Sequence, residues 1–461
     1  MFDDTIAAIA TPLGAGGLAV LRISGAAAMA VADRVFLPVG KQPLAPSTAP
    51  THTIHYGKIV RHGETVDEVL LSVLRAPRTF TREDTVEISC HGGLLPAKLV
   101  LDTILENGAR LAEPGEFTRR AFLNGRLDLA QAEAVADLIH SRTELALTAA
   151  NEQLAGKLSQ RINQLRDEMM KTLAHIEAHI DFPDEDITPD TRAALINRLE
   201  NGAAFMEELL RTANEGQILR RGIRAAIVGR PNAGKSSLLN QLLGHDRAIV
   251  SPIAGTTRDT IEETANIRGL PVVFIDTAGL REARDEIEVE GIRRSRESLA
   301  KAELILHVLD ASESITPADE IYLTEFAAKK RILVRNKTDL PTRLKLPNDS
   351  PFTTQDSRIV DVCCLSGQGM EELKDAIKSL VWAGKIEAGM LQVMINSRHQ
   401  DALNRARAST RQAVDALRAD ATLELVAMDL RIAANAVGEI VGQTNTEDLL
   451  DAIFSTFCIG K

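Results

Sequence analysis

The strongest constraint on the fold lies in residues 222–240, where a short apolar run leads into a glycine-rich turn and then a helical pattern. The run at 225–228 predicts a buried parallel strand. The turn at 229–236 matches G-x-x-x-x-G-K-[ST] at every fixed position. Its glycines let successive backbone N–H groups and a helix N-terminus converge on one phosphate. An ordinary strand–helix turn is the alternative, but the order of strand, loop and helix favours a phosphate site.

Length and composition limit what the rest of the chain can be. A chain of 461 residues is longer than one hydrophobic core normally supports, so we expect several domains. The net charge of −11 argues against a protein that coats nucleic acid non-specifically, although it leaves room for a local basic patch. Because no apolar run reaches about 18 residues, no membrane span is expected, and the N-terminus does not resemble a signal peptide. Four cysteines without metal-type spacing indicate a reducing cytoplasm.

The order of strand-like and helix-like patterns divides the chain into three kinds of domain. We expect an N-terminal α+β domain over residues 1–120 and helical segments over 121–216 and 381–461. Residues 217–380 alternate strand-length and helix-length stretches, which predicts an α/β unit with a mostly parallel sheet. The simplest interpretation is a discontinuous helical domain interrupted by an inserted nucleotide-binding domain.

An apolar stripe runs through the first helical segment. Its members recur every three or four residues: Leu154, Leu158, Ile162, Leu165, Met169, Leu173, Ile176 and Ile180. This spacing predicts one long helix with an apolar face, which packs either inside a bundle or against a second chain. Expected partner helices at 397–419, 421–441 and 446–457 favour the bundle.

Two glycine-rich turns, at residues 14–17 and 91–93, border strand-like runs in the N-terminal domain. Each could bring the backbone close to a small ligand. Plain turns between strands are the alternative, and the sequence alone favours them.

Three further motifs follow the phosphate loop in the order that a GTP-binding domain requires. They are Gly255-Thr256-Thr257-Arg258-Asp259, Asp276-Thr277-Ala278-Gly279 and Asn336-Lys337-Thr338-Asp339. The last predicts guanine selectivity, because Asp339 can accept hydrogen bonds from N1–H and the exocyclic amine while Asn336 faces the other edge of the base. Two such bonds, each worth about 1.5–3 kcal/mol, would favour GTP over ATP by roughly 10²- to 10⁴-fold.

The residues that face the phosphates follow from the same motifs. Lys235 is expected to supply a point charge to the β- and γ-phosphates, while Ser236 and Thr257 hold Mg²⁺. Asp276 is expected behind the metal, and the Gly279 N–H near the γ-phosphate. The nucleotide-binding set predicted from the motifs is Asn232, Ala233, Gly234, Lys235, Ser236, Ser237, Thr257, Asp276, Thr277, Ala278, Gly279, Asn336, Lys337 and Asp339.

The group that activates water is not the usual one. Leu280 follows the Asp-Thr-Ala-Gly motif, where many small GTPases carry a water-orienting Gln, and an apolar side chain cannot polarise water. The next stretch, 281–290, holds Glu282, Asp285, Glu286, Glu288 and Glu290. It is either a solvated acidic loop or the source of a carboxylate that positions the water, and the residues alone do not choose among them.

Several longer motifs resemble the MnmE (TrmE) family of bacterial tRNA-modification GTPases. They are Leu21-Arg-Ile-Ser-Gly25, Pro114-Gly-Glu-Phe117, residues 121–133 and Phe457-Cys-Ile-Gly-Lys461. The resemblance covers essentially the whole chain and implies an enzyme that works with an MnmG-type flavoprotein. Together they would add an aminomethyl or carboxymethylaminomethyl group to C5 of the tRNA wobble uridine. It also implies a homodimer formed through the N-terminal domain, and a heterotetramer with the flavoprotein.

The resemblance further implies two ligands beyond GTP and Mg²⁺. A 5-formyl-tetrahydrofolate-type one-carbon donor would bind the N-terminal domain, where the matching residues are Arg22, Glu87, Arg126 and Lys461. Arg126 stands where the family can have lysine, which keeps the charge but changes its geometry. A potassium ion would be held by Asn232, Ser251, Ile253 and Thr256, and Ser251 and Thr256 also join the nucleotide-binding set. Glu288 matches the family's water-activating glutamate.

Three of the cysteines require comment. Cys458 is either an inert residue near the chain end or a catalytic thiol, because Lys461 could lower its pKa and the family places it near the folate. Cys363-Cys364 replaces the Ser-Ala pair that is usual in the last guanine-contacting loop. That loop mainly offers backbone N–H groups to the base, so we expect the substitution to be tolerated.

An RNA-binding ribosome-assembly GTPase is the alternative function, because it would share the nucleotide motifs. Such proteins usually carry a basic module after the GTPase domain, whereas this chain is acidic and ends in Cys-x-x-Lys. A membrane-remodelling GTPase is disfavoured, since no amphipathic or lipid-anchor segment is found. We therefore expect the protein to bind tRNA and not to bind a membrane.

Overall fold

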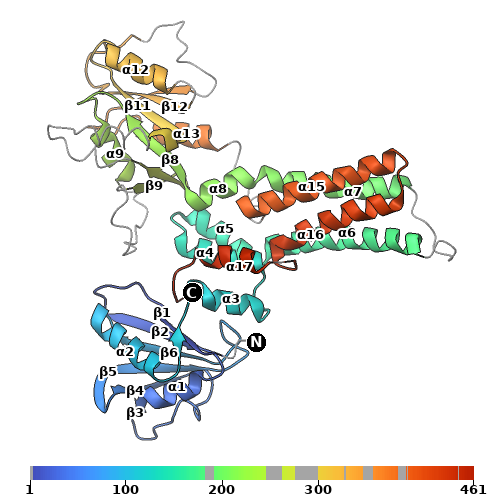
Figure 1. Ribbon diagram of the computed structural model, residues 1–461. Helices are drawn as coiled ribbons and strands as arrows, with labels where there is room; N and C mark the ends of the chain where they lie inside the picture. Colours follow the sequence, from blue (N-terminus) through green and yellow to red (C-terminus); the bar gives the residue numbers. More distant parts are fainter. Residues whose placement is uncertain are drawn as a thin grey trace.

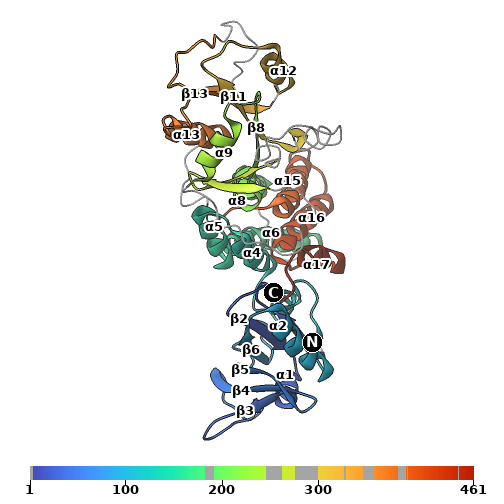
Figure 2. The same cartoon turned by 90° about the vertical axis from the view of Figure 1, so that its left-hand side faces the viewer.

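The computed structural model describes residues 4–181, 192–244, 262–275, 299–326, 329–345, 357–382, 391, 393–444 and 446–460. It contains an N-terminal α+β part, a helical part and an α/β part at the opposite end of the molecule (Figure 1). Seen from the side, the three parts follow one another along the long axis (Figure 2). The expected multidomain organisation, with a helical part and an α/β part that has a mostly parallel sheet, is confirmed.

The N-terminal part is built on a seven-stranded sheet with the order β3-β4-β5-β6-β2-β1-β7. Its strands are β1 Ile6–Ile9, β2 Leu18–Ser24, β3 Phe36–Pro38, β4 Thr53–Arg61, β5 Glu64–Leu74, β6 Thr85–His91 and β7 Arg110–Leu111. Helices α1 (Ala28–Val35) and α2 (Leu94–Glu106) pack with one face of the sheet in a single apolar core. The side chains on the opposite face are therefore the ones that the two helices leave available to ligands or partners.

That opposite face carries an exposed apolar patch. Tyr56 on β4 pairs with Leu70 on β5, and Ile54 lies two residues before Tyr56, so the three side chains share one face. Leu37 on β3 pairs with Lys58 and joins them. All four apolar residues are between 47% and 68% exposed. We call Leu37, Ile54, Tyr56 and Leu70 the N-terminal apolar patch.

The two glycine-rich turns of the N-terminal part pack against each other. The Gly92 N–H donates to the Gly17 carbonyl at 3.2 Å. A Cβ atom on Gly92 would lie 2.1 Å from the Gly16 carbonyl oxygen, so only glycine fits there. This close approach accounts for Gly92 by packing of the two turns against each other.

The helical part is a bundle in which α6 (Lys157–Asp181) and α7 (Arg192–Arg211) pack with α15 (Ser397–Arg418) and α16 (Leu423–Val441). Stripe residues from Leu158 to Ile176 lie in the shared core, so the stripe packs inside the chain as the bundle interpretation predicted. The prediction of one helix from Leu154 was wrong at its start. Leu154 ends α5 (Glu144–Leu154), because Gly156 adopts a positive φ of 84° that interrupts the helix before α6.

Shorter helices join the bundle to its neighbours. They are α3 (Glu116–Leu123), α4 (Leu129–His140), α8 (Ala213–Arg221) and α17 (Glu447–Phe454). Phe454 and Phe457 pack with Leu129 of α4, which brings the end of the chain against the start of the helical part. None of the helices in the described ranges is long and apolar enough to cross a membrane.

The α/β part has a six-stranded sheet with the order β13-β12-β11-β8-β10-β9, parallel except for the β9–β10 pair. Its elements are β8 Ile223–Val228, α9 Lys235–Leu243, β9 Glu263–Ile267, β10 Leu270–Phe274, β11 Leu304–Asp310, α12 Pro317–Glu325, β12 Lys330–Asn336, β13 Ser357–Asp361 and α13 Met370–Val381. All residues of the central strand β11 are buried, as expected for a strand covered on both faces. Because β8, β11, β12 and β13 are parallel, the loops at their carboxyl ends meet at one edge.

Candidate functional site

The phosphate-loop motif forms the turn between β8 and α9. Gly234, which has a φ of 101°, directly precedes Lys235, the first residue of the helix. A Cβ atom on Gly234 would lie 2.1 Å from Nδ2 of Asn336, so the turn needs glycine for both its backbone and its neighbour. The Lys235 ammonium donates to the carbonyls of Gly229 and Arg230 at 3.0 and 2.8 Å, and its burial lowers its pKa. The loop thus presents a helix N-terminus and a cation side by side, an arrangement suited to phosphate.

The Asn336–Asp339 turn follows β12 and lies directly against the phosphate loop. The Asn336 amide donates to the carbonyl of Ala233 at 3.0 Å and accepts from the backbone N–H of Cys364 at 3.1 Å. Lys337 pairs with Asp310 at the end of β11, with an Nζ–Oδ2 distance of 2.6 Å. Burial opposes ionisation of Asp310, but Lys337 and Ser312 outweigh it and lower its pKa. Asp339 is exposed at the end of the turn.

Arg230 of the phosphate loop is anchored to the start of α12. Its guanidinium donates to Glu313 at 2.7 Å and lies 3.4 Å from a carboxylate oxygen of Asp319. Asp319 is buried and caps α12 together with Thr316. Sequence reasoning missed this contact, because the motif leaves the second position of the loop unspecified.

A second cluster lies in the N-terminal part, on the sheet face that α1 and α2 leave open. Arg22 on β2 pairs with Glu87 on β6, and its Nε donates to Oε1 at 2.8 Å. The Arg126 guanidinium lies 4.8 Å from the centre of the Phe80 ring, and that of Arg22 lies 5.7 Å from the same ring. Phe80 therefore brings the predicted residues Arg22, Glu87 and Arg126 together.

This cluster carries an excess of positive charge. Burial lowers the pKa of Arg126, and the neighbouring cations Arg82 and Arg22 lower it further. Arg126 donates to the Thr79 carbonyl at 3.3 Å, and Arg82 donates to the Asn124 carbonyl at 3.0 Å. Within the part of the chain that the structure describes, the hydrogen-bond partners of both guanidinium groups are neutral carbonyls, so the cluster is suited to an anionic, planar ligand.

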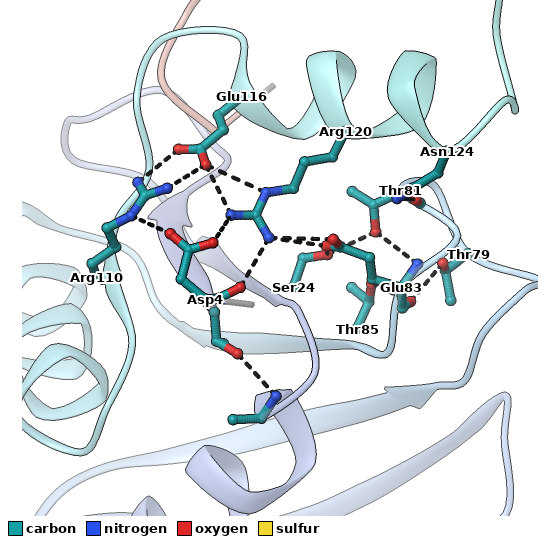
Figure 3. A network of polar contacts seen from close by, with 12 residues as sticks. Asp4, Ser24, Thr79, Thr81, Glu83, Thr85, Arg110, Glu116, Arg120 and Asn124 are labelled. Atoms are coloured by element: carbon teal, nitrogen blue, oxygen red, sulfur yellow. Dashed lines mark hydrogen bonds and ion pairs between the residues drawn. The ribbon is translucent and has the colours of Figure 1, made fainter. Parts of the chain in front are cut away.

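A buried ion network surrounds Arg120 in the same N-terminal part (Figure 3). Arg120 is fully buried and contacts Asp4, Glu83 and Glu116, with its closest Asp4 oxygen at 2.7 Å. Burial opposes ionisation of Glu116, but Arg110 and Arg120 outweigh it and lower its pKa. Glu83 also accepts from Ser24 on β2 at 2.8 Å. The network ties the start of the chain, the 79–85 segment and α3 into one support.

Comparison with known proteins decides the family. Residues 5–126 match the sequence model described as the GTP-binding protein TrmE N-terminus, and residues 129–458 match that of the MnmE helical domain. The tRNA modification GTPase MnmE of Geobacillus kaustophilus (strain HTA426) is 47% identical over 462 residues, which cover 99% of both chains. The chain belongs to the MnmE family of tRNA modification GTPases.

Other MnmE proteins match equally well. That of Geobacillus thermodenitrificans (strain NG80-2) is 48% identical over 462 residues, and that of Listeria welshimeri serovar 6b is 47% identical over 459. Each alignment covers 99% of this chain and 99% of the relative. The resemblance to the MnmE family that the motifs indicated is confirmed, and it extends over the whole chain.

The structure describes only part of the site predicted for an MnmE protein. Asn232, Ala233, Gly234, Lys235, Ser236 and Ser237 lie together in the phosphate loop and the first turn of α9, next to Asn336 and Lys337. The predicted residues Ser251, Ile253, Thr256, Thr257, Asp276, Thr277, Ala278, Gly279, Glu288 and Lys461 lie outside the described residues.

Cys458 lies where the end of the chain meets the N-terminal part. Its carbonyl accepts from the Gly115 N–H at 3.3 Å, and its side chain is exposed. Two residues later, Gly460 lies so close to Ile9 that an added Cβ would be 2.5 Å from the Ile9 carbonyl oxygen. The tail therefore reaches the end of β1, whose Ile9 pairs with Leu21, the neighbour of Arg22. The described contacts of Cys458 do not include Arg22, Glu87 or Arg126.

Phe80 and Arg82 are the site residues that sequence reasoning missed in the N-terminal part. They belong to Arg78-Thr79-Phe80-Thr81-Arg82, in which one aromatic residue is flanked on each side by a threonine and then an arginine. Aromatic residues make up only 3% of the chain, so a phenylalanine flanked by arginines was the available signal.

Proposed function

We propose that this chain is a GTP-hydrolysing enzyme of tRNA modification that acts in the cytoplasm with an MnmG-type flavoprotein. The pair would add an aminomethyl or carboxymethylaminomethyl group to C5 of the wobble uridine. The observation that carries the proposal is the near-half identity, over 99% of both chains, to proteins named tRNA modification GTPase MnmE. The ribosome-assembly alternative has no comparable support, since the matched relatives carry the tRNA modification name.

In this proposal the nucleotide occupies the edge where the phosphate loop meets the Asn336–Asp339 turn. Lys235 would hold the β- and γ-phosphates, and the N-terminus of α9 would face them. Asn336 and Asp339 would read the base, with Asp339 accepting from the guanine N1–H and amine. We call Asn336–Asp339 the base-reading turn. Support comes from the Asn336–Ala233 hydrogen bond, which joins this turn to the phosphate loop.

The proposed metal ions would complete this site. A hydroxyl such as that of Ser236, at the first turn of α9, is a ligand that Mg²⁺ accepts, with Thr257 and Asp276 proposed on the other side. Asn232 is exposed on the phosphate loop with a φ of 62°, and its neutral amide oxygen suits K⁺ together with Ser251, Ile253 and Thr256. These ions would neutralise charge that develops on the transferring phosphate, while Glu288 orients the water.

A one-carbon folate is the proposed ligand of the N-terminal cluster. A folate combines a planar ring with carboxylates, and the cluster combines the Phe80 ring with Arg22, Arg82 and Arg126. Lys461 is proposed to join it from the chain end, and Cys458 to act nearby as a thiol. Titration of 5-formyl-tetrahydrofolate into the protein tests the proposal. Phe80→Ala and Arg126→Ala should weaken binding by about tenfold or more, whereas Arg34→Ala, at an exposed helix end, should not.

A homodimer is proposed through the N-terminal apolar patch. Contiguous exposed apolar side chains on an open sheet face favour burial against a second chain. Replacement of Tyr56 and Leu70 by Glu should shift the protein from dimer to monomer in analytical ultracentrifugation. A dimer that survives this double substitution places the contact elsewhere.

Two experiments test the central proposal separately. Asp339→Asn should change the nucleotide preference from guanosine to xanthosine, because the amide then presents a donor to the base. Mass spectrometry of tRNA nucleosides from cells with and without the gene tests the modification. An unchanged wobble-uridine profile would remove the tRNA assignment and leave the GTPase assignment in place.

A further inference from the structure

Arg230, the second residue of the phosphate loop, begins a tight turn that carries Asn232. The Ala233 N–H donates to the Arg230 carbonyl at 3.4 Å, which closes a four-residue turn over Pro231 and Asn232. Proline at the second position and a positive φ at the third, 62° at Asn232, match a type II turn. Asn232 therefore occupies the corner of the turn, where it is exposed.

Both ends of this turn are held by other elements of the α/β part. The Ala233 carbonyl, at the end of the turn, accepts from the Asn336 amide of the base-reading turn at 3.0 Å. The Arg230 guanidinium, at the start, donates to Glu313 at 2.7 Å and lies 3.4 Å from Asp319. We call the contact of Arg230 with Glu313 and Asp319 the arginine clamp.

Asp319 gives the arginine clamp a rigid base. It is 2% exposed, and its Oδ2 accepts from the backbone N–H and the hydroxyl of Thr316 at 3.0 and 2.8 Å. These bonds cap the start of α12, so Asp319 cannot move without disturbing the first turn of that helix. Because the Arg230 side chain is only 16% exposed, water screens the clamp less than it screens a surface ion pair.

The backbone between the clamp and the exposed amide is stiff. The ring of Pro231 fixes its own φ, and a residue that precedes proline is restricted to extended conformations. A rotation at Arg230 would therefore move Asn232 rather than be absorbed between the two residues. The position of the Asn232 amide oxygen thus depends on where the clamp holds Arg230.

We propose that Arg230 is a positioning residue for the monovalent cation, because its clamp on α12 fixes the turn that presents the Asn232 amide oxygen. The inference rests on the proposed potassium site at Asn232. It predicts a smaller effect on the phosphates, since Lys235 and the N-terminus of α9 follow Ala233, which Asn336 holds separately.

The test compares the potassium dependence of GTP hydrolysis by the full-length protein with its affinity for GDP. Arg230→Ala should raise the K⁺ concentration that gives half-maximal hydrolysis by about 5- to 20-fold, because charge-assisted contacts are lost. The GDP dissociation constant should stay within about threefold, because Lys235 and the helix N-terminus remain. Arg230→Lys keeps a cation in the clamp and should recover most of the K⁺ affinity.

The matched control is another arginine–glutamate pair. Arg221 pairs with Glu303 at 2.7 Å but is 51% exposed, and it lies at the end of α8, away from the phosphate loop. Arg221→Ala should change neither the half-maximal K⁺ concentration nor the GDP dissociation constant.

Hydrogen exchange supplies a readout that does not depend on catalysis. The Ala233 N–H closes the turn, so it should exchange faster in Arg230→Ala than in the unmodified protein, with neither nucleotide nor K⁺ added. Exchange within β8 and α9 should stay the same. Faster exchange throughout these two elements would show a general structural role and overturn the proposal.

Two double variants show whether the residues act through one contact. Arg230→Ala combined with Glu313→Ala should have the same half-maximal K⁺ concentration as Arg230→Ala alone. Arg230→Ala combined with Asn232→Ala should hydrolyse GTP in KCl as fast as Asn232→Ala alone. Losses that add fully in either pair overturn the positioning role.

The outcomes separate this inference from the potassium site on which it rests. If the unmodified protein hydrolyses GTP equally fast in KCl and NaCl, the site at Asn232 is absent and both proposals fall. If it prefers KCl but Arg230→Ala keeps the same half-maximal K⁺ concentration, only the positioning role is overturned. A loss of GDP affinity as large as the loss of K⁺ affinity also overturns it.

Discussion

The side-chain amide of Asn336 joins three separate segments of the α/β part. It donates to the Ala233 carbonyl in the phosphate loop at 3.0 Å and accepts from the Cys364 N–H at 3.1 Å. Asn336 is 3% exposed and ends strand β12, so the contact is fixed by the sheet. The Asn336–Asp339 turn, the phosphate loop and the loop after β13 are therefore joined into one unit.

Replacement of Asn336 by Ala should separate this unit. The Ala233 carbonyl and the Cys364 N–H would lose their partners, and each unmade buried hydrogen bond costs about 1–3 kcal/mol. We expect GTP and GDP to bind more weakly by about 10²-fold or more, measured by fluorescence titration. Asn240→Ala, on the exposed face of α9, is the control. Dissociation constants within threefold of the unmodified protein would show that the amide does not support the site.

Removal of the Arg120 side chain should destabilise the N-terminal part selectively. Arg120→Met would remove the fully buried cation that contacts half-buried Glu83, and it would leave buried Glu116 with Arg110 as its remaining ion-pair partner within the described residues. Removing one partner of a buried ion pair typically costs about 3–5 kcal/mol. The single tryptophan, Trp382, packs in the core of the α/β part, so its fluorescence reports on that part only. We expect calorimetry to show a lower unfolding temperature for the N-terminal part. The unfolding temperature followed by tryptophan fluorescence should stay unchanged.

The control for Arg120 is a surface ion pair. Lys98 pairs with Asp102 one turn away on α2 and is 68% exposed, so Lys98→Ala should change the free energy of unfolding by less than about 0.5 kcal/mol. If Arg120→Met moves the calorimetric transition no further than Lys98→Ala does, the network in Figure 3 contributes little to stability.

The sequence contained the local parts of the nucleotide site but not their contacts. The phosphate loop and the Asn336–Asp339 turn could be predicted because each is a contiguous pattern at the end of an apolar strand. Asn336 and Ala233 are 103 residues apart, and their contact depends on β11 lying between β8 and β12. Strand order is set by packing over the whole sheet, so no local pattern predicts it.

The contacts of the N-terminal cluster were even harder to predict from local sequence patterns. Arg126 meets Phe80 through the fold of α3 and the 79–85 segment, and neither residue belongs to a periodic pattern. Resemblance to the family supplied Arg22, Glu87 and Arg126, whereas Phe80 emerged only from the structure. The helix boundary at Gly156 was missed for a local reason, since apolar spacing continues across the turn although the backbone does not.

Stability of the α/β part should fall as the solution is acidified from about pH 6.5 to pH 4. His307 on β11 is 1% exposed, and burial lowers its pKa to about 4, although Asp319 opposes the shift. The unfolded chain binds a proton near pH 6.5, so between these values it holds more protons than the folded chain and is favoured. The loss amounts to at most about 3 kcal/mol.

Unfolding followed by Trp382 fluorescence at several pH values checks this. His307→Leu should flatten the dependence between pH 6.5 and 4, because the group that titrates differently in the two states is gone. His62→Gln, at an 80%-exposed side chain of the N-terminal part, should leave the dependence unchanged. A slope that persists in His307→Leu assigns the acid sensitivity to carboxylates such as Asp310 instead, whose pKa is lowered in the folded chain.

The proposed potassium site would make GTP hydrolysis depend on the monovalent cation. Asn232 is exposed on the phosphate loop in a left-handed backbone conformation, with a φ of 62°. A cation beside its amide oxygen would offset charge on the phosphates as an arginine finger does, an effect worth about 10³–10⁵ in rate. We therefore expect hydrolysis to be at least about tenfold faster in KCl than in NaCl at equal ionic strength.

The same assay with Asn232→Ala separates the ion from a general salt effect. Loss of the amide oxygen should bring the rate in KCl down toward that in NaCl, while GDP affinity stays close to normal because Lys235 and the helix N-terminus remain. Asn240→Ala should keep the full preference for potassium. Equal rates in the two salts for the unmodified protein would exclude the potassium site, whereas a preference that survives Asn232→Ala would assign the ion to other ligands.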